Sequence, residues 1–187
     1  DGLDGDGTKE ALRGFQIKNR EEDPFSHEIK HIKPVWPRQA DVEKVFGKPG
    51  TNHTTIKLPY AFRLAWNKNT KINKLIVNAK CADSLVRVLN KVLNHYGLEK
   101  IQELGLDIFG GCFNDRTMRG GTRKSMHAYA IALDFDPERN QLRWGRDKAQ
   151  MAKPEYAAFL DAFESEGWIS LGRERNFDWM HVQAARL

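Results

Sequence analysis

The pattern of apolar and polar residues predicts a mixed α+β fold. Apolar residues recur at helical spacing across residues 79–96, and this stripe ends at Gly97. A second stripe predicts a helix over 154–168, and a short helix closed by glycine is expected at 41–47. Helices and strands follow one another without a regular βαβ order, which favours a small antiparallel sheet with flanking helices.

Several short segments have the alternation or composition of strands. They cover residues 54–58, 60–66, 106–113, 130–135 and 181–184. Pro59 separates the first two, because proline cannot donate a hydrogen bond to a neighbouring strand. In the fourth, Ile131, Leu133 and Phe135 alternate with Ala130, Ala132 and Asp134. One face of this strand is therefore expected in the core, and the other leaves space around Asp134.

Two histidines and one aspartate are candidate metal ligands. His127 precedes Asp134 by seven residues, and His181 follows near the end of the chain. On one regular strand an odd spacing places side chains on opposite faces, so His127 is expected on a loop that enters the strand. Two imidazoles and a carboxylate form the ligand set of an open catalytic zinc site. The sequence therefore predicts that His127, Asp134 and His181 hold Zn²⁺.

These residues also carry a resemblance to the M15 zinc peptidases. That family has the motif Ser-x-His-x-x-Gly-x-Ala-x-Asp, followed far downstream by Glu/Asp-x-x-His. The matching residues are Ser125, His127, Ala132, Asp134, Asp178 and His181. Ala130 stands where the family has glycine, and its methyl group costs stability if the position needs a positive φ. The resemblance covers roughly residues 35–187, and the paired motifs are more specific than either alone.

The resemblance implies an M15-like zinc domain and roles for further residues. Asp178 would be the general base, and Arg116 would stabilise the oxyanion or orient the substrate. Arg119 is the alternative arginine, and Ser125 would donate a hydrogen bond to the substrate. The family includes D-alanyl-D-alanine carboxypeptidases, D-Ala-D-Ala dipeptidases and phage L-alanyl-D-glutamate endopeptidases. The second motif, Asp-Trp-Met-His-Val-Gln, is most similar to the phage endolysins.

The expected substrate is consequently the stem peptide of peptidoglycan, cut at the L-alanyl-D-glutamate bond. Two alternatives stay open. A D-alanyl-D-alanine carboxypeptidase or dipeptidase would keep the zinc site but recognise a free C-terminal carboxylate. A non-catalytic, zinc-containing cell-wall-binding domain would keep the metal and lack the base, against which the presence of Asp178 argues.

The N-terminal part is expected to be separate from the catalytic domain, which we place at residues 38–187. Residues 1–20 resemble the end of a peptidoglycan-binding repeat, through Asp4-Gly5-Asp6-Gly7-Thr8 and the following apolar residues. Residues 21–37 combine prolines with many charges and predict a linker. The first segment therefore suggests the remnant of a wall-binding module.

The linker contains a second candidate metal motif. His27-Glu28-Ile29-Lys30-His31 matches His-Glu-x-x-His, in which two histidines on one helical turn bind zinc. Pro24 and Pro34 leave room for only two or three helical turns, and Lys30 would place a cation beside the metal. We therefore interpret this motif as part of an exposed, charged linker.

Amino-acid composition restricts the binding partners and the cellular location that we expect for the protein. Thirty Lys and Arg against 25 Asp and Glu give a net charge of +5, which favours approach to anionic polymers such as peptidoglycan. The basic residues are scattered and form no nucleic-acid-binding motif, so no nucleic acid partner is expected.

No apolar run is long enough for stable membrane insertion. Cys81 and Cys112 are expected to be buried thiols, as in a protein made in a reducing cytoplasm. We expect a soluble monomer that is made in the bacterial host cytoplasm and acts on the cell wall.

Overall fold

The structure, a computed structural model, describes residues 31–187. One compact unit runs from Lys33 to Leu187. Within the described part, no helix is long and apolar enough to cross a membrane. The expected wall-binding remnant at residues 1–20 and most of the linker motif lie outside the described residues. The domain boundaries stay a prediction, although Trp36, at the end of the expected linker, is buried in the core of this unit.

Six strands form one sheet in the order β2-β1-β3-β4-β6-β5. β1 pairs with β3 in parallel, whereas every other neighbouring pair is antiparallel. The strands are β1 (His53–Leu64), β2 (Asn67–Asn78), β3 (Ile108–Gly111), β4 (Ala132–Phe135), β5 (Ile169–Ser170) and β6 (His181–Gln183). A mostly antiparallel sheet accompanied by helices confirms the predicted α+β class.

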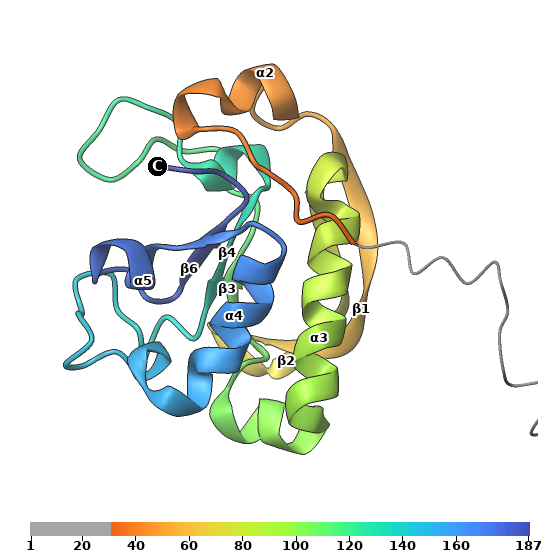
Figure 1. Cartoon of the computed structure of the whole chain (residues 1–187), viewed down its shortest axis with the longest axis vertical. Coiled ribbons are helices and arrows are strands. Elements are labelled where there is room, and N and C mark those ends of the chain that lie inside the picture. The colour runs from red at the N-terminus through yellow and green to blue at the C-terminus, as the bar shows by residue number, and fades with distance from the viewer. Residues whose placement is uncertain (1–30) are drawn as a thin grey trace, which may run out of the picture. The chain divides into compact units, whose positions relative to one another are not determined.

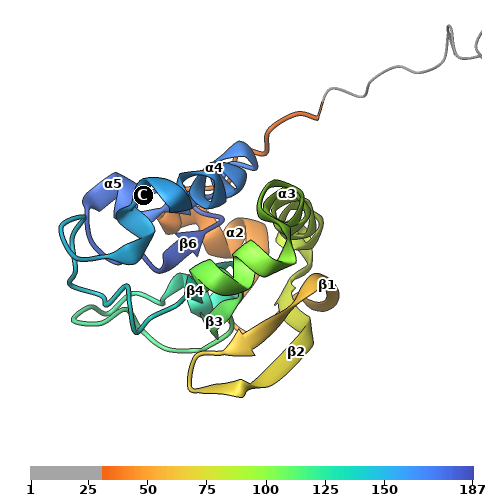
Figure 2. The ribbon, with the colours of Figure 1, turned by 90° about the horizontal axis from the view of Figure 1, so that it is seen from below.

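Helices α3 and α4 lie side by side over one face of this sheet (Figures 1 and 2). The α-helices are α2 (Val42–Phe46), α3 (Ala79–Leu104), α4 (Ala157–Ser165) and α5 (Leu171–Arg175). Short 3-10 helices are η1 (Gln39–Asp41), η2 (Met126–Tyr129), η3 (Gln150–Ala152) and η4 (Pro154–Tyr156). The helices thus close the core on one side of the central strands.

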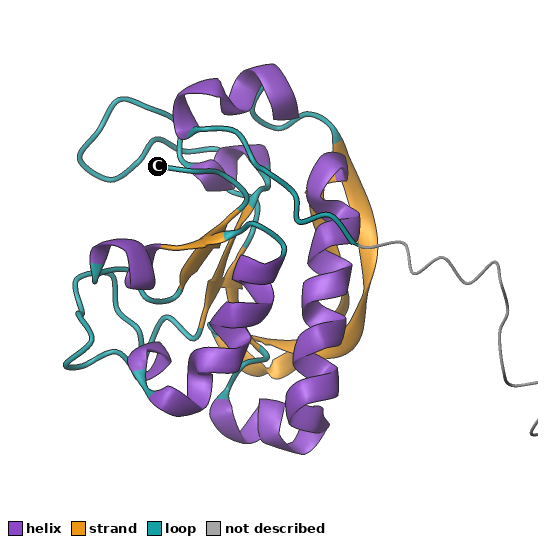
Figure 3. Cartoon of the chain, viewed as in Figure 1, coloured by secondary structure: helices purple, strands orange, loops and turns teal. Residues whose placement is uncertain are grey.

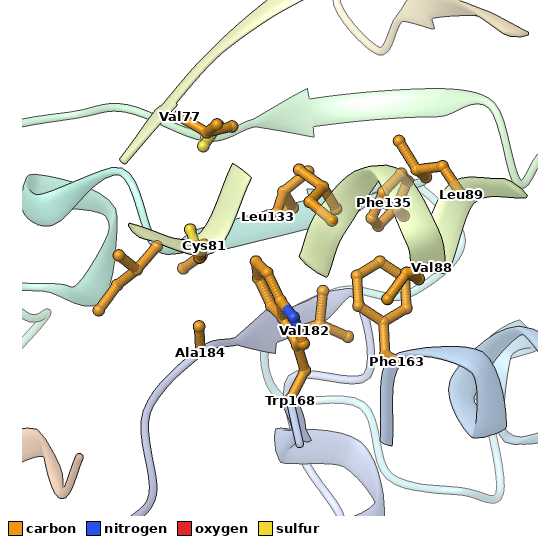
Figure 4. Packing of buried hydrophobic residues seen from close by; sticks show 14 of the residues in the cluster. Val77, Cys81, Val88, Leu89, Leu133, Phe135, Phe163, Trp168, Val182 and Ala184 are labelled. Atoms are coloured by element: carbon orange, nitrogen blue, oxygen red, sulfur yellow. The ribbon is translucent and has the colours of Figure 1, made fainter. Parts of the chain in front are cut away.

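The core forms between the central strands and these two helices, as Figure 4 shows. Its buried side chains come from β4, β6, α3, α4 and the segment after α4: Leu133, Phe135, Val182, Val88, Leu89, Phe163 and Trp168. The Phe163 ring centroid lies 5.9 Å from that of Phe135 and 5.6 Å from that of Trp168. Cys81 and Cys112 are free and buried, as predicted. This packing fixes the inner face of β4 and leaves its other face for Asp134.

The first hairpin differs from the prediction. The two segments expected on either side of Pro59 form one strand, β1, with a register shift against β2 between Lys57 and Phe62. A shifted register tolerates proline because the local ladder is already interrupted. β2 itself was not predicted. It lies beside β1 at one edge of the sheet, whose strands are orange in Figure 3. Its first eight residues are nearly all polar and exposed, so they lack apolar alternation.

Gly97 interrupts α3 where the sequence predicts the end of the helix. Its φ of 70° and ψ of 161° are not helical, so the glycine stops the first helical segment as predicted. A second helical segment, which was not predicted, follows the kink and continues to Leu104. Its residues Ile101 and Leu104 are buried, and their packing into the core stabilises these added turns.

Candidate metal centre

A sharp turn brings His127 to the face of the sheet that carries Asp134. Ser125 caps η2, its Oγ accepting a hydrogen bond from the His127 amide at 3.3 Å. Ala130 ends η2 with φ 54° and ψ 39°, after which the chain enters β4. This left-handed residue supplies the change of direction that the odd spacing requires. The position does need a positive φ, so the alanine methyl costs on the order of 1 kcal/mol relative to an unstrained backbone.

His181 reaches the same place through strand pairing. Asp134 and His181 are direct partners in the antiparallel β4–β6 register, so their side chains share one face. His181 Nδ1 lies 3.0 Å from Asp134 Oδ1 and 3.2 Å from His127 Nε2. His127 Nε2 lies 3.3 Å from Asp134 Oδ2. The structure therefore brings together the three predicted ligand residues, whose donor atoms all lie within 4.8 Å of one another.

The second nitrogen of each imidazole is occupied by a protein acceptor. His127 Nδ1 lies 2.8 Å from the carbonyl oxygen of Cys112. His181 Nε2 lies 3.1 Å from Gln183 Oε1. Such partners orient metal-bound histidines and set which nitrogen carries the proton. The remaining nitrogens face the carboxylate, so two nitrogens and one carboxylate form a donor set that fits zinc.

The charges of these three groups depend on one another. Burial alone would raise the pKa of Asp134, but hydrogen bonds from His127 and His181 hold this pKa well below its usual range. Burial would lower the pKa of His181, and the hydrogen bond and charge of Asp134 outweigh it and raise that pKa. The carboxylate is therefore ionised at neutral pH, as a metal ligand must be.

Asp178 lies in the turn between α5 and β6. Its carbonyl oxygen accepts a hydrogen bond from the His181 amide at 3.0 Å, and its own amide donates to Leu142 at 2.9 Å. Its φ is 55°, and its buried Oδ1 has no hydrogen-bond partner within the described part of the chain. Burial and the nearby Asp134 charge raise the pKa of Asp178 to about 6, against lowering by His181, His127 and Arg119. Asp178 is thus a carboxyl group able to exchange a proton near neutral pH.

A cleft of about 830 Å³ contains Asp178 and the three ligand residues. Four arginines line it: Arg116, Arg119, Arg143 and Arg175. None of them forms a salt bridge with another described residue. The cleft therefore presents an excess of positive charge, four guanidinium groups against the carboxylates of Asp134 and Asp178, which suits a substrate that carries carboxylates.

The arginine loop before η2 is shaped by backbone hydrogen bonds. The Ser125 amide donates to the Arg116 carbonyl at 3.0 Å, and Met118 donates to Arg123 at 2.8 Å. The Arg116 guanidinium donates to the neighbouring Thr117 carbonyl at 3.2 Å. Ser125 and both predicted arginines line the cleft, whereas their contact with substrate stays a prediction.

Sequence reasoning missed several residues around the site. Arg143 and Arg175 come from segments distant from the motif, and no local pattern marks them. His127 contacts the backbone carbonyl of Cys112, and because every residue has a backbone carbonyl, the amino-acid sequence does not indicate this contact. Gln183 ends the second motif, but the sequence analysis assigned it no role. Its contact with His181 could have been predicted, because it follows His181 by two residues on a strand and so shares its face.

A comparison with family models supports the site. Residues 119–184 match a model of the M15 peptidases, Peptidase_M15_4, described as D-alanyl-D-alanine carboxypeptidase. The matched segment contains His127, Asp134, Asp178 and His181. Comparisons with curated proteins and with solved structures give no match. Residues 119–184 are therefore similar to the M15 peptidases, and they contain His127, Asp134 and His181, which form a candidate metal site.

Proposed function

We propose that this protein is a zinc-dependent peptidase that cuts the stem peptide of peptidoglycan at the L-alanyl-D-glutamate bond. The observation that carries the proposal is the arrangement of Asp178, a buried carboxyl group, in one cleft with His127, Asp134 and His181. The similarity of residues 119–184 to the M15 peptidases supports peptidoglycan peptides as the substrate class. The wall-binding resemblance of residues 1–20 supports action at the cell wall.

Different residues of the cleft serve different steps of peptide hydrolysis. Zn²⁺, when bound, supplies a Lewis acid that polarises a carbonyl and acidifies water. Asp178 accepts the proton of the attacking water and returns it to the leaving amine. Burial raises the pKa of Asp178 to about 6 in the metal-free protein, and bound Zn²⁺ would lower it, so the carboxyl group is mostly ionised at pH 7 and can accept a proton. Arg116 or Arg119 stabilises the developing oxyanion or binds a substrate carboxylate.

The four arginines of the cleft fit the carboxylates of a stem peptide. The D-glutamate of peptidoglycan is linked through its side-chain carboxyl group, so its α-carboxylate remains free next to the L-alanyl bond. Arginine binds carboxylates in a bidentate manner, and none of the four has a described salt-bridge partner. The choice of the L-alanyl-D-glutamate bond is supported by the resemblance of the second motif to phage endolysins.

D-alanyl-D-alanine carboxypeptidase activity is the second candidate function. It is favoured by the description of the matching family model. The same metal ligands and Asp178 would serve both reactions, and only the position of the scissile bond separates them.

Mass spectrometry of digested peptidoglycan distinguishes the two. New N-terminal D-glutamate is expected from the endopeptidase, and release of free D-alanine from the carboxypeptidase. Zinc analysis of His127→Ala, Asp134→Ala and His181→Ala should show loss of the bound metal. Digestion without new D-glutamate termini would exclude the proposed bond.

Amidated substrates test the role of the arginines. We expect a stem peptide whose D-glutamate α-carboxylate is amidated to show roughly a tenfold higher KM, the effect of losing one charged contact worth about 1.4 kcal/mol. Arg143→Gln and Arg175→Gln report which arginine recognises the α-carboxylate. If the recognising arginine is replaced, the amidated and the unmodified peptide should have the same KM. Arg146→Gln is a matched control, since Arg146 is exposed outside the cleft.

A further inference from the structure

We propose that Gln183 is a positioning residue that holds His181 with its proton on Nε2, which leaves Nδ1 free to bind the metal. This inference rests on the metal site of the proposed function and goes beyond it. It gives a role to the buried amide of Gln183, which ends the second motif and to which the proposed reaction assigns no step.

The amide orientation of Gln183 is fixed by its partners. Gln183 is 1% exposed, and its Nε2 donates to the Ala185 carbonyl oxygen at 2.9 Å. Because a carbonyl oxygen only accepts, the amino end of the amide must face Ala185. Gln183 Oε1 therefore faces His181 Nε2 at 3.1 Å. An amide oxygen also only accepts, so the contact is a hydrogen bond only when His181 Nε2 carries the proton.

Asp134 exerts the opposite influence on His181. Its Oδ1 lies 3.0 Å from Nδ1, so the carboxylate stabilises a proton on the nitrogen that has to bind the metal. Without an acceptor at Nε2, neutral His181 would keep its proton on Nδ1, where it blocks metal binding. Gln183 supplies that acceptor inside the protein, where water would otherwise have to do so.

The proton of His127 is directed by a backbone acceptor and not by a side chain. The imidazole Nδ1 lies beside the Cys112 carbonyl oxygen, which directs the proton away from Nε2. The two histidines thus bind through different nitrogens, and each has an acceptor at the other. His127 serves as an internal reference, because a change at Gln183 leaves its acceptor intact.

Zinc affinity is the first test, measured by competition with a chelator. Gln183→Met keeps the length of the side chain and removes the acceptor, and it should weaken zinc binding by about 10- to 100-fold. Gln183→Glu keeps an acceptor for His181, so it should bind zinc within a few-fold of wild type, although it is less stable because its carboxylate faces the Ala185 oxygen. Gln39→Met is the matched control. It removes only a 3.4 Å contact to the same Gln183 oxygen and should leave zinc affinity unchanged.

Nitrogen NMR of the imidazole rings is the second test. Metal-free wild-type protein, at a pH where the imidazoles are neutral, should show a population of His181 protonated on Nε2. In Gln183→Met this population should shift to Nδ1, while the His127 signals stay unchanged. Metal-free wild type with His181 protonated entirely on Nδ1 overturns the proposal, and this arm needs no variant to fold. Gln183→Met with unchanged zinc affinity and His181 tautomer overturns it as well.

The two readouts separate this inference from the proposed function. Wild-type protein that binds no metal contradicts the zinc peptidase, whereas the tautomer measurement still decides the role of Gln183. Zinc-loaded protein that does not cut peptidoglycan contradicts the proposed substrate and leaves the affinity comparison intact.

Discussion

Asp178 combines features that destabilise a fold and suit a general base. Its carboxyl group is buried, one oxygen lacks a described hydrogen-bond partner, and its backbone is left-handed. Each of these costs free energy in the folded state. Strain and a shifted pKa at one position in a cleft favour a functional role over a structural one.

Asp178→Asn tests that role with little disturbance of the backbone. Asparagine has nearly the same volume and accepts a positive φ well, whereas alanine at φ 55° would add strain. We expect the zinc-loaded variant to fold and keep its metal while kcat falls about 10²- to 10⁴-fold. Zinc content and stem-peptide turnover are measured on the same sample. Wild-type turnover in zinc-loaded Asp178→Asn would disprove the proposed mechanism.

The same substitution should stabilise the metal-free protein at neutral pH. Because the pKa of Asp178 rises from 3.8 to about 6 on folding, the folded state binds the proton more tightly than the unfolded state. Wild-type stability therefore falls as pH rises from 3.8 to 6, by about 3 kcal/mol at 1.36 kcal/mol per pKa unit. We expect the free energy of unfolding of Asp178→Asn, relative to that of wild type, to be higher at pH 7 than at pH 3, a gain that denaturation of both proteins at the two pH values measures. Zinc should reduce this gain, since a nearby cation lowers the pKa of the carboxyl group.

At the level of elements, α5 positions the turn that carries Asp178. Trp179 follows Asp178 and is buried against Gly172 of α5. A Cβ atom at Gly172 would meet the Trp179 ring well inside van der Waals contact. The absence of a side chain at Gly172 therefore allows the indole to pack and holds the following residues in register with β6.

Gly172→Ala should disturb this packing. Alanine is normally the better helix former, so a loss of stability would report the clash with Trp179 rather than helix propensity. We expect a loss of about 1–3 kcal/mol, typical of overpacking, and a fall in peptidase activity. Gly121→Ala is the control, because its Cβ would have only ordinary contacts and should change stability by less than about 0.5 kcal/mol. Equal unfolding midpoints for the two variants would contradict the packing role of Gly172.

At the level of the whole molecule, positive charge should govern the approach to the cell wall. The net charge is +5, and four arginines line the cleft. Charges on a surface are screened within about 10 Å at 0.1 M salt. We expect binding to intact sacculi to weaken as salt rises, while turnover of a short soluble stem peptide changes much less. Cosedimentation and peptide hydrolysis over the same salt series compare the two, and an equal salt dependence would count against wall approach by charge.

The sequence by itself determined the fold class, the main helices and the three candidate metal-ligand residues. These depend on short-range regularities: the apolar stripe of residues 79–96, the alternation around Leu133, and the spacing within two motifs. It also identified the position of Ala130 as one where a methyl group could be costly, and the left-handed backbone there agrees.

Only the tertiary structure decided the features that depend on distant contacts. The second helical segment of α3, after Gly97, depends on burial of Ile101. β2 depends on its pairing with β1 because its own residues are mostly polar. Arg143 and Arg175 share one cleft with the candidate metal ligands only after folding. The raised pKa of Asp178 and the contact of Gln183 with His181 follow from burial and from strand register. A one-dimensional pattern records which groups are present, whereas their solvation and hydrogen-bond partners are set by residues far away in the chain.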